Sequence, residues 1–116
     1  MYLIITRNFP PELGGMQILM WGLSNSLAKH GIVKVFAEDH KDAVSHDKNV
    51  KYQIERIGGF KFFRKFRKAN LINEYLKENT SITTVIADHW KNLEKINSDL
   101  LKNKKTICLI HSKEIN

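Results

Sequence analysis

The chain has 116 residues, 42% hydrophobic and 27% charged, which is an ordinary composition for one globular domain and excludes collagen, repeat arrays and low-complexity disorder. Nineteen Lys and Arg residues against twelve Asp and Glu residues give a formal net charge of +7, which indicates an anionic partner such as a phosphorylated ligand, a nucleic acid or an anionic membrane. The single cysteine, Cys108, cannot form an intramolecular disulfide, which fits a reducing compartment. No apolar run is as long as the hydrophobic region of a signal peptide or a membrane-spanning helix. We therefore expect a cytoplasmic protein.

The first part of the chain predicts two strands around one helix. Residues 2–6 form a continuous apolar run rich in β-branched side chains, which is typical of a strand covered on both faces. After a loop, hydrophobic residues recur at three- and four-residue steps, which predicts a helix from about Met16 to His30. Gly31 stands where a helix C-terminal glycine belongs, and residues 32–37 predict a second strand.

The rest of the chain continues this alternation after a polar loop. The remaining predicted elements are a loop over residues 38–49, a strand over 50–57, a helix over 61–78, a strand over 82–87, a short helix over 91–103 and a strand over 105–110. Alternating strands and helices imply an α/β fold with a Rossmann-like parallel sheet and helices on both faces, in a single domain over residues 1–116. Because only six residues follow the last predicted strand, nothing remains to cover it, and we expect the domain to be an incomplete part of a larger protein.

A glycine-rich loop joins the first predicted strand to the first predicted helix. Gly14 and Gly15 place backbone N–H groups at the start of that helix, where directed hydrogen bonds and the helix dipole attract phosphate. The loop has neither the G-x-G-x-x-G pattern of dinucleotide-binding proteins nor a Walker A sequence. The residues alone leave two interpretations open, a phosphate site or a tight turn that binds nothing.

Two segments carry a resemblance to a known family. Residues 9–16, FPPELGGM, followed by a helix, a His30-Gly31 turn and a strand, resemble the start of the family 4 glycosyltransferases. Residues 108–114, CLIHSKE, are similar to a second motif of that family, in which H-G-x-E or H-G-x-D follows a strand. The sequence departs from the pattern twice, because His30-Gly31 stands where Gly-His is usual and Ser112 where Gly is common.

The resemblance implies the N-terminal, acceptor-side domain of a retaining glycosyltransferase with the two-domain GT-B fold. Such enzymes transfer a sugar from a nucleotide-sugar donor, a substrate rather than a cofactor, to a glycan or lipid-linked acceptor. By resemblance, the backbone of Gly14 and Gly15 approaches the donor diphosphate and His111 lies beside the donor sugar. From the residues alone, the alternative is that His111 ends a strand and caps a following helix. The family holds the nucleotide in a second domain, so we expect that domain in cis or in trans and no activity from this chain alone.

Polar side chains also follow the fourth predicted strand. Asp88 and His89 would hydrogen-bond the hydroxyls of the acceptor while Trp90 offers an aromatic face, and the alternative is a polar loop with Trp90 packed in the core. Glu114 would either hold an acceptor hydroxyl or cap a helix. The histidines show no ligand spacing with Cys108, so we expect no metal site.

The predicted helix over residues 61–78 begins with a basic and aromatic segment. At about 100° per residue, one helix face carries Lys61, Arg64, Lys65 and Lys68, and a neighbouring face carries Phe62, Phe66, Ala69 and Leu76. A cationic face beside an aromatic face is typical of a helix that lies on anionic lipid, so it predicts peripheral binding to the inner face of the membrane through the four basic residues. The alternatives are a solvated helix with its phenylalanines in the core, or a nucleic-acid patch, which the crowding of aromatic residues on one element disfavours.

Two functions without chemistry compete with the enzyme. One is a flavodoxin-like or response-regulator-like binding module, but such domains place acidic residues after the first strand, where this chain has Thr6-Arg7-Asn8. The other is a basic protein that associates with nucleic acid, for which salt-dependent binding without attachment to lipid vesicles would be diagnostic.

Overall fold

The computed structural model describes residues 1–7 and 9–109. Within these residues, five strands form one parallel sheet in the order β3-β2-β1-β4-β5, which confirms the α/β fold with a Rossmann-like sheet. The strands are β1 (Tyr2–Ile5), β2 (Val33–Glu38), β3 (Gln53–Ile57), β4 (Thr84–Ala87) and β5 (Lys105–Cys108). The helices are α1 (Gly15–Ala28), α2 (Ala43–Asp47) and α3 (Lys61–Glu78), with two 3-10 turns, η1 (Trp90–Asn92) and η2 (Ser98–Leu101).

The strand β1 lies at the centre of the sheet and marks a reversal of its order. Tyr2 pairs with Val33 of β2 on one side and with Thr84 of β4 on the other. The chain first builds outward from β1 to β3, and then crosses back to place β4 and β5 on the opposite side. Open parallel sheets bind ligands at such a reversal, outside the carboxyl ends of the strands. A ligand is therefore expected to bind at the loops that follow β1 and β4.

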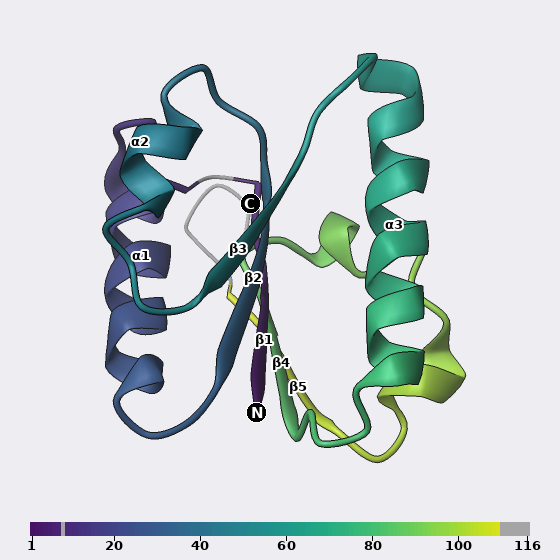
Figure 1. Ribbon diagram of the computed structural model, residues 1–116. Coiled ribbons are helices and arrows are strands. Elements are labelled where there is room, and N and C mark those ends of the chain that lie inside the picture. Colours follow the sequence, from purple (N-terminus) through teal and green to yellow (C-terminus); the bar gives the residue numbers. More distant parts are fainter. Residues whose placement is uncertain (8, 110–116) are drawn as a thin grey trace.

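Helices cover both faces of the sheet (Figure 1), with α1 and α2 on one face and α3, η1 and η2 on the other. The alternation of side chains along β1 explains this arrangement. Ile4 is buried in the core cluster that includes Met20 of α1, whereas Leu3 is buried in the cluster that includes Ile72 and Leu76 of α3. Each of these residues is fully or almost fully removed from solvent, so the sheet is apolar on both faces, as its continuous apolar runs predict.

Two expectations about the connections are wrong. The predicted loop over residues 38–49 contains the helix α2, a five-residue helix that tertiary contacts from β3 stabilise and that periodicity alone could not reveal. The predicted helix over residues 91–103 is instead the two turns η1 and η2. The side chains of His89 and Asn97 accept hydrogen bonds from backbone N–H groups two residues later, so each starts a short turn of its own.

The structure bears on membrane insertion in one respect. In the ranges 1–7 and 9–109, none of the helices combines the length and the apolar character that crossing a bilayer requires.

Candidate functional site

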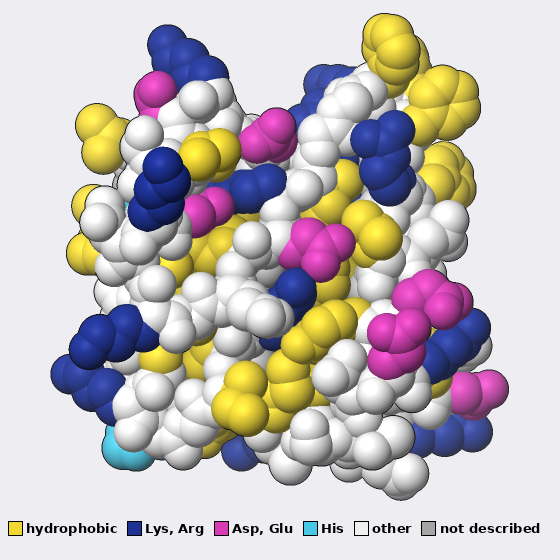
Figure 2. Space-filling model, in the orientation of Figure 1, with side chains coloured by type: hydrophobic (Ala, Val, Ile, Leu, Met, Phe, Trp, Pro, Cys, Tyr) yellow, Lys and Arg dark blue, Asp and Glu magenta, His cyan; other side chains and the backbone are white. Residues whose placement is uncertain are grey.

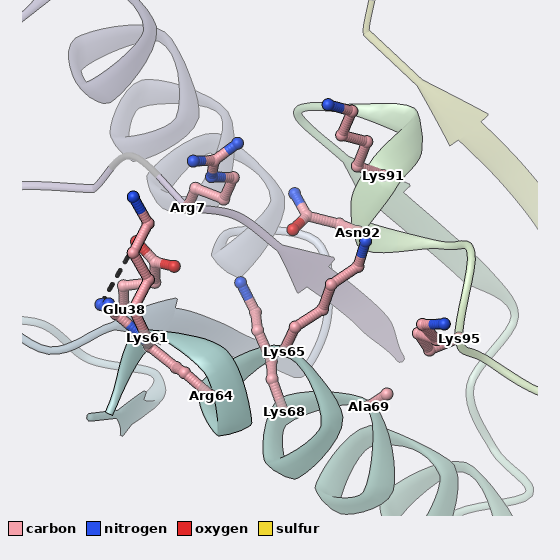
Figure 3. A pocket seen from close by; sticks show the side chains of 10 residues that line it. All are labelled: Arg7, Glu38, Lys61, Arg64, Lys65, Lys68, Ala69, Lys91, Asn92 and Lys95. Atoms are coloured by element: carbon pink, nitrogen blue, oxygen red, sulfur yellow. Dashed lines mark ion pairs between the residues drawn. The ribbon is translucent and has the colours of Figure 1, made fainter. Parts of the chain in front are cut away.

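A cationic pocket with a volume of about 250 Å³ opens at the carboxyl ends of the strands. Four segments build it: the loop after β1, the end of β2, the first half of α3, and the stretch from η1 toward η2 (Figure 3). We call it the basic pocket. Its lining residues are Arg7, Glu38, Lys61, Arg64, Lys65, Lys68, Ala69, Lys91, Asn92 and Lys95. Seven of these side chains are cationic and one is acidic, so the pocket favours an anionic ligand.

The helix α3 contributes four of the cations. Lys61, Arg64, Lys65 and Lys68 all line the basic pocket, which confirms the prediction that they share one helix face. That face is directed toward the carboxyl edge of the sheet, and Lys65 and Lys68 rise from α3 toward the segments that carry Arg7 and Asn92 (Figure 3). The basic residues therefore enclose a concave site as well as charging the surface of the helix.

Lys68 lies at the buried end of this group. Its side chain belongs to a residue that is only 6% exposed, and its Nζ donates a hydrogen bond to the backbone oxygen of Thr6 at 2.8 Å. Burial lowers the pKa of Lys68 to about 8, although the carboxylates of Glu38 and Asp88 act in the opposite direction. Lys68 thus presents its charge to the interior of the basic pocket rather than to the outer surface of the protein.

Three other cations of the basic pocket, Arg64, Lys65 and Lys95, have partners around its rim. Lys65 pairs with Glu94 at 2.7 Å, and the hydrogen bond between them lowers the pKa of that carboxyl. Arg64 lies 3.9 Å from Glu38, the acidic residue of the lining. The Nζ of Lys95 lies 5.0 Å from the centre of the Phe66 ring. These contacts orient the side chains around the cavity, but they add few negative charges to it.

Asp88 fastens the loop after β4 to the loop after β1. Its carboxylate is 1% exposed and accepts hydrogen bonds from the Thr6 hydroxyl at 2.7 Å, from the Arg7 backbone N–H at 3.0 Å and from the Asn92 amide. Asp88 is predicted to contact an acceptor, and in this structure its carboxylate accepts these three hydrogen bonds from the protein. Its role in this structure is to position Arg7 and Asn92 beside the basic pocket.

His89 and Trp90 lie next to this junction. The Nδ1 of His89 accepts a hydrogen bond from the Lys91 backbone N–H, and the His89 ring stacks on Trp90 with ring centres 5.8 Å apart. Trp90 is 51% exposed, so the alternative in which it packs in the core is wrong. An exposed aromatic face beside the site remains consistent with the predicted contact to an acceptor.

Gly14 and Gly15 lie at the amino end of α1, on the other face of the sheet. Gly14 precedes the helix with an extended backbone, and Gly15 is the first helical residue. A Cβ atom built on Gly15 would meet nothing within 4 Å, so the backbone there is open to an approaching ligand. Both glycines are outside the lining of the basic pocket, and the structure therefore contains two candidate anion sites along one edge of the sheet.

Arg56 of β3 holds the loop that leads to the two glycines. Its guanidinium donates to the Pro10 backbone oxygen at 2.6 Å and to Asp47 of α2 at 2.8 Å, and it lies over the ring of Phe9 with 5.6 Å to the ring centre. Burial alone would raise the pKa of Asp47, but hydrogen bonds from Arg56 and His46 outweigh it and lower that pKa. Arg56 could not be identified from the sequence because these partners lie 9 and 46 residues away.

Three further cations of the basic pocket were not predicted from the sequence. Arg7, Lys91 and Lys95 lie on segments that follow strands β1 and β4, and this position was the available signal, because the carboxyl ends of parallel strands meet at one edge. Two predicted site residues, His111 and Glu114, lie outside the described residues. In the part of the chain that the structure describes, no group of His, Cys, Asp and Glu side chains could hold a metal ion.

The phenylalanines of α3 are exposed, so the alternative that buries them in the core is wrong. The helix has 18 residues and is about 27 Å long, whereas the five residues of β3 span about 17 Å. The first turns of α3 therefore extend past the sheet, and hydrophobic side chains gather there on the surface (Figure 2). The exposed residues are Phe60, Phe62, Phe63 and Phe66, which we call the phenylalanine patch.

Comparison with known proteins adds no assignment. No family model matches the sequence, and no curated protein matches it.

Proposed function

We propose that this chain is the N-terminal, acceptor-side domain of a retaining glycosyltransferase. The enzyme would transfer a sugar from a nucleotide-sugar donor to a glycan or a lipid-linked acceptor. One observation carries the proposal: the FPPxxGG loop of residues 9–15 follows the central strand, borders the reversal of strand order and leads directly into α1. Phosphate groups bind at such helix starts, and ligands of open parallel sheets bind at such reversals.

The chemistry of this proposal divides between two domains. The backbone N–H groups of Gly14 and Gly15 would donate hydrogen bonds to the donor diphosphate, and stabilisation of the charge that develops on this leaving group would be the main catalytic effect. His111 would lie beside the donor sugar. A second domain, in cis or in trans, would hold the nucleotide, so this chain alone would bind the donor weakly and transfer no sugar.

Peripheral attachment to an anionic membrane forms part of the same proposal. The residues of the phenylalanine patch are between 54% and 87% exposed, and Lys61, Arg64 and Lys65 lie on the adjoining face of α3. An aromatic surface beside cations is suited to the boundary between lipid headgroups and acyl chains, where each basic residue contributes about 1 kcal/mol. Attachment there would bring the carboxyl edge of the sheet close to a lipid-linked acceptor.

The donor site can be tested by titrating the ¹⁵N-labelled chain with uridine, guanosine and adenosine diphosphates. We expect weak binding that shifts the amide signals of Gly14, Gly15 and Met16. Gly15→Ala should remove these shifts, because the added methyl group would occupy open space at the proposed site without disturbing a neighbouring residue. A turn without a ligand would make the same substitution harmless.

Gly22→Ala is the matched control for this experiment. Gly22 is an exposed residue within α1, and a Cβ atom there also meets nothing within 4 Å. The control should leave the nucleotide shifts unchanged and stabilise the helix by about 0.5 to 1 kcal/mol. Nucleotide shifts that avoid the Gly14 and Gly15 amides, or that survive Gly15→Ala, would contradict the donor site. Sugar transfer by this chain alone would contradict the division between two domains.

A further inference from the structure

We propose that the basic pocket binds a phosphate monoester, the charged group of a phosphorylated acceptor. The pocket lies on the α3 face of the sheet, away from the two glycines on the α1 face, and so it is a site separate from the proposed donor site. The role in acceptor recognition rests on the proposed function, whereas the binding of the phosphate group does not.

The balance of charge is the first support. Arg7, Lys91 and Lys95 approach the four cations of α3, and Glu38 is the acidic member of the described lining. Cations that a fold gathers so closely repel one another, and a bound dianion would relieve this repulsion. The terminal phosphate of a monoester carries about −1.5 to −2 charges at pH 7 and three acceptor oxygens, which matches this surplus of cations better than a carboxylate does.

The size of the pocket is the second support. A volume of about 250 Å³ lies just below the range of roughly 300 to 1,000 Å³ that is typical of small-molecule sites. It accommodates a phosphate group and the adjoining part of its carrier. A nucleic-acid backbone needs a cationic surface that continues along the strand, so a concave and local site favours a single phosphate group.

The placement of the donors is the third support. The ammonium group of Lys68 has three N–H donors, and the backbone oxygen of Thr6 takes one of them. Arg7 offers a planar fork of donors suited to phosphate, and its backbone is tied to Asp88. Asp88 also holds the Asn92 amide at the pocket wall. The buried Asp88 carboxylate, through its hydrogen bonds to Arg7 and Asn92, thus preorganises the site for a ligand.

Inorganic phosphate is the probe for the first experiment, at constant ionic strength with chloride as the balancing anion. We expect saturable binding, measured by calorimetry, with amide shifts at Arg7, Lys65 and Asn92. The double variant Arg7→Gln/Lys91→Gln should weaken binding by about tenfold or more, because it removes two charged donors. Both residues are exposed, so the variant should fold normally.

Lys29→Gln/Lys102→Gln is the matched control. It removes the same charge from positions before β2 and β5, at the opposite edge of the sheet, and it should leave the phosphate affinity unchanged. Equal losses in the two double variants, or no saturable binding, would overturn the site. Amide shifts at Arg7, Lys65 and Asn92 report the basic pocket, whereas shifts at Gly14, Gly15 and Met16 report the donor site, so the failure of one site can be told apart from the failure of the other.

A second experiment distinguishes the sources of the phosphate group. Competition of glucose 1-phosphate with inorganic phosphate would identify a soluble sugar phosphate as the carrier. Stronger binding to vesicles with phosphatidic acid than to vesicles with phosphatidylserine of the same surface charge, lost in Arg7→Gln/Lys91→Gln, would identify a lipid headgroup. Either result supports the site. A single-stranded oligonucleotide that displaces phosphate far more strongly than both monoesters would overturn it in favour of nucleic acid.

Discussion

At the scale of single residues, the burial of the charged Lys68 side chain lowers the stability of the folded protein. Its ammonium group is buried where α3 meets the end of β1, facing Glu38 and Asp88 together with the cations Arg7 and Arg64. The pKa of about 8 shows that burial outweighs the two carboxylates. Helical periodicity placed Lys68 on the basic face, but periodicity could not reveal that this end of the face is enclosed.

The pH dependence of unfolding should reveal this cost. The pKa of Lys68 is about 8 in the folded protein and 10.5 in its ordinary state, so between these values the unfolded chain binds more protons. The free energy of unfolding should therefore rise with pH in this window, on the order of 2 kcal/mol from about pH 7.5 to about pH 9.5. Urea denaturation of the wild type and of Lys68→Met at the two pH values measures the rise.

Lys68→Met should lose this rise, whereas Lys77→Met, which alters an exposed lysine of the same helix, should retain it. An equal rise in all three proteins would show that Lys68 titrates as it does in water. Burial raises the pKa of Tyr52 to about 12, so this tyrosine does not titrate within the window.

At the scale of elements, Arg56 links three segments that the sequence keeps apart. Its guanidinium joins β3 to Asp47 of α2 and to Pro10 of the glycine loop, and it also donates to the backbone oxygen of Glu38 at the end of β2. The short helix α2 has little stability of its own, so these contacts decide its formation. The shape of the glycine loop thus depends on a side chain from the edge strand.

Arg56→Met should lower the free energy of unfolding by about 2 to 3 kcal/mol, because the Arg56–Asp47 pair is largely buried. Amide hydrogen exchange should become faster in residues 9–15 and in α2. Arg67→Met is the control, since Arg67 is exposed and donates to the Gly58 backbone oxygen, and it should cost less than 1 kcal/mol.

The same pair also predicts how the protein responds to acid. Because the pKa of Asp47 is lowered in the folded state, its contribution is present above about pH 4 and is lost as the pH falls through the folded value. The wild type should therefore lose more stability than Arg56→Met between pH 7 and pH 3. Parallel losses would show that the Arg56–Asp47 pair adds nothing in solution.

At the scale of the whole molecule, charge and exposed aromatic surface gather at one edge. The carboxyl ends of the strands carry the basic pocket, and the overhanging turns of α3 carry the phenylalanine patch beside it. An edge with both features is suited to an anionic membrane, whereas either feature alone would have several common uses.

Sedimentation with lipid vesicles tests this orientation. The chain should bind vesicles that contain phosphatidylserine and should leave pure phosphatidylcholine vesicles unbound. Phe62→Ser/Phe63→Ser should reduce binding by about tenfold or more, because two exposed aromatic side chains no longer enter the interface. Ile32→Ser/Val44→Ser removes two exposed hydrophobic side chains from other surfaces and should bind as the wild type does. Equal binding by both double variants would contradict attachment through α3.

Much of the fold was determined by the sequence itself. Apolar runs predicted β1, β2, β4 and β5, an alternation of apolar and polar residues predicted β3, and helical spacing predicted α1 and α3. A central strand covered on both faces is apolar throughout, and a covering helix needs one apolar face. The glycine loop could also be located, since Gly14 and Gly15 stand between a strand and a helix. Each of these features is formed by residues that are neighbours in the sequence, so the pattern of hydrophobic and glycine residues is enough to predict it.

The tertiary structure alone decided the shape of the candidate sites. Arg7 joins Lys65 and Lys68 across more than fifty residues of sequence, and Arg56 reaches Pro10 over 46 residues. The basic face of α3 became one wall of a pocket, and its phenylalanines became exposed, because the helix is longer than the strands beneath it. The sequence predicts which side chains share a helix face. Whether that face lines a pocket or is exposed to solvent depends on how a long helix packs against shorter strands.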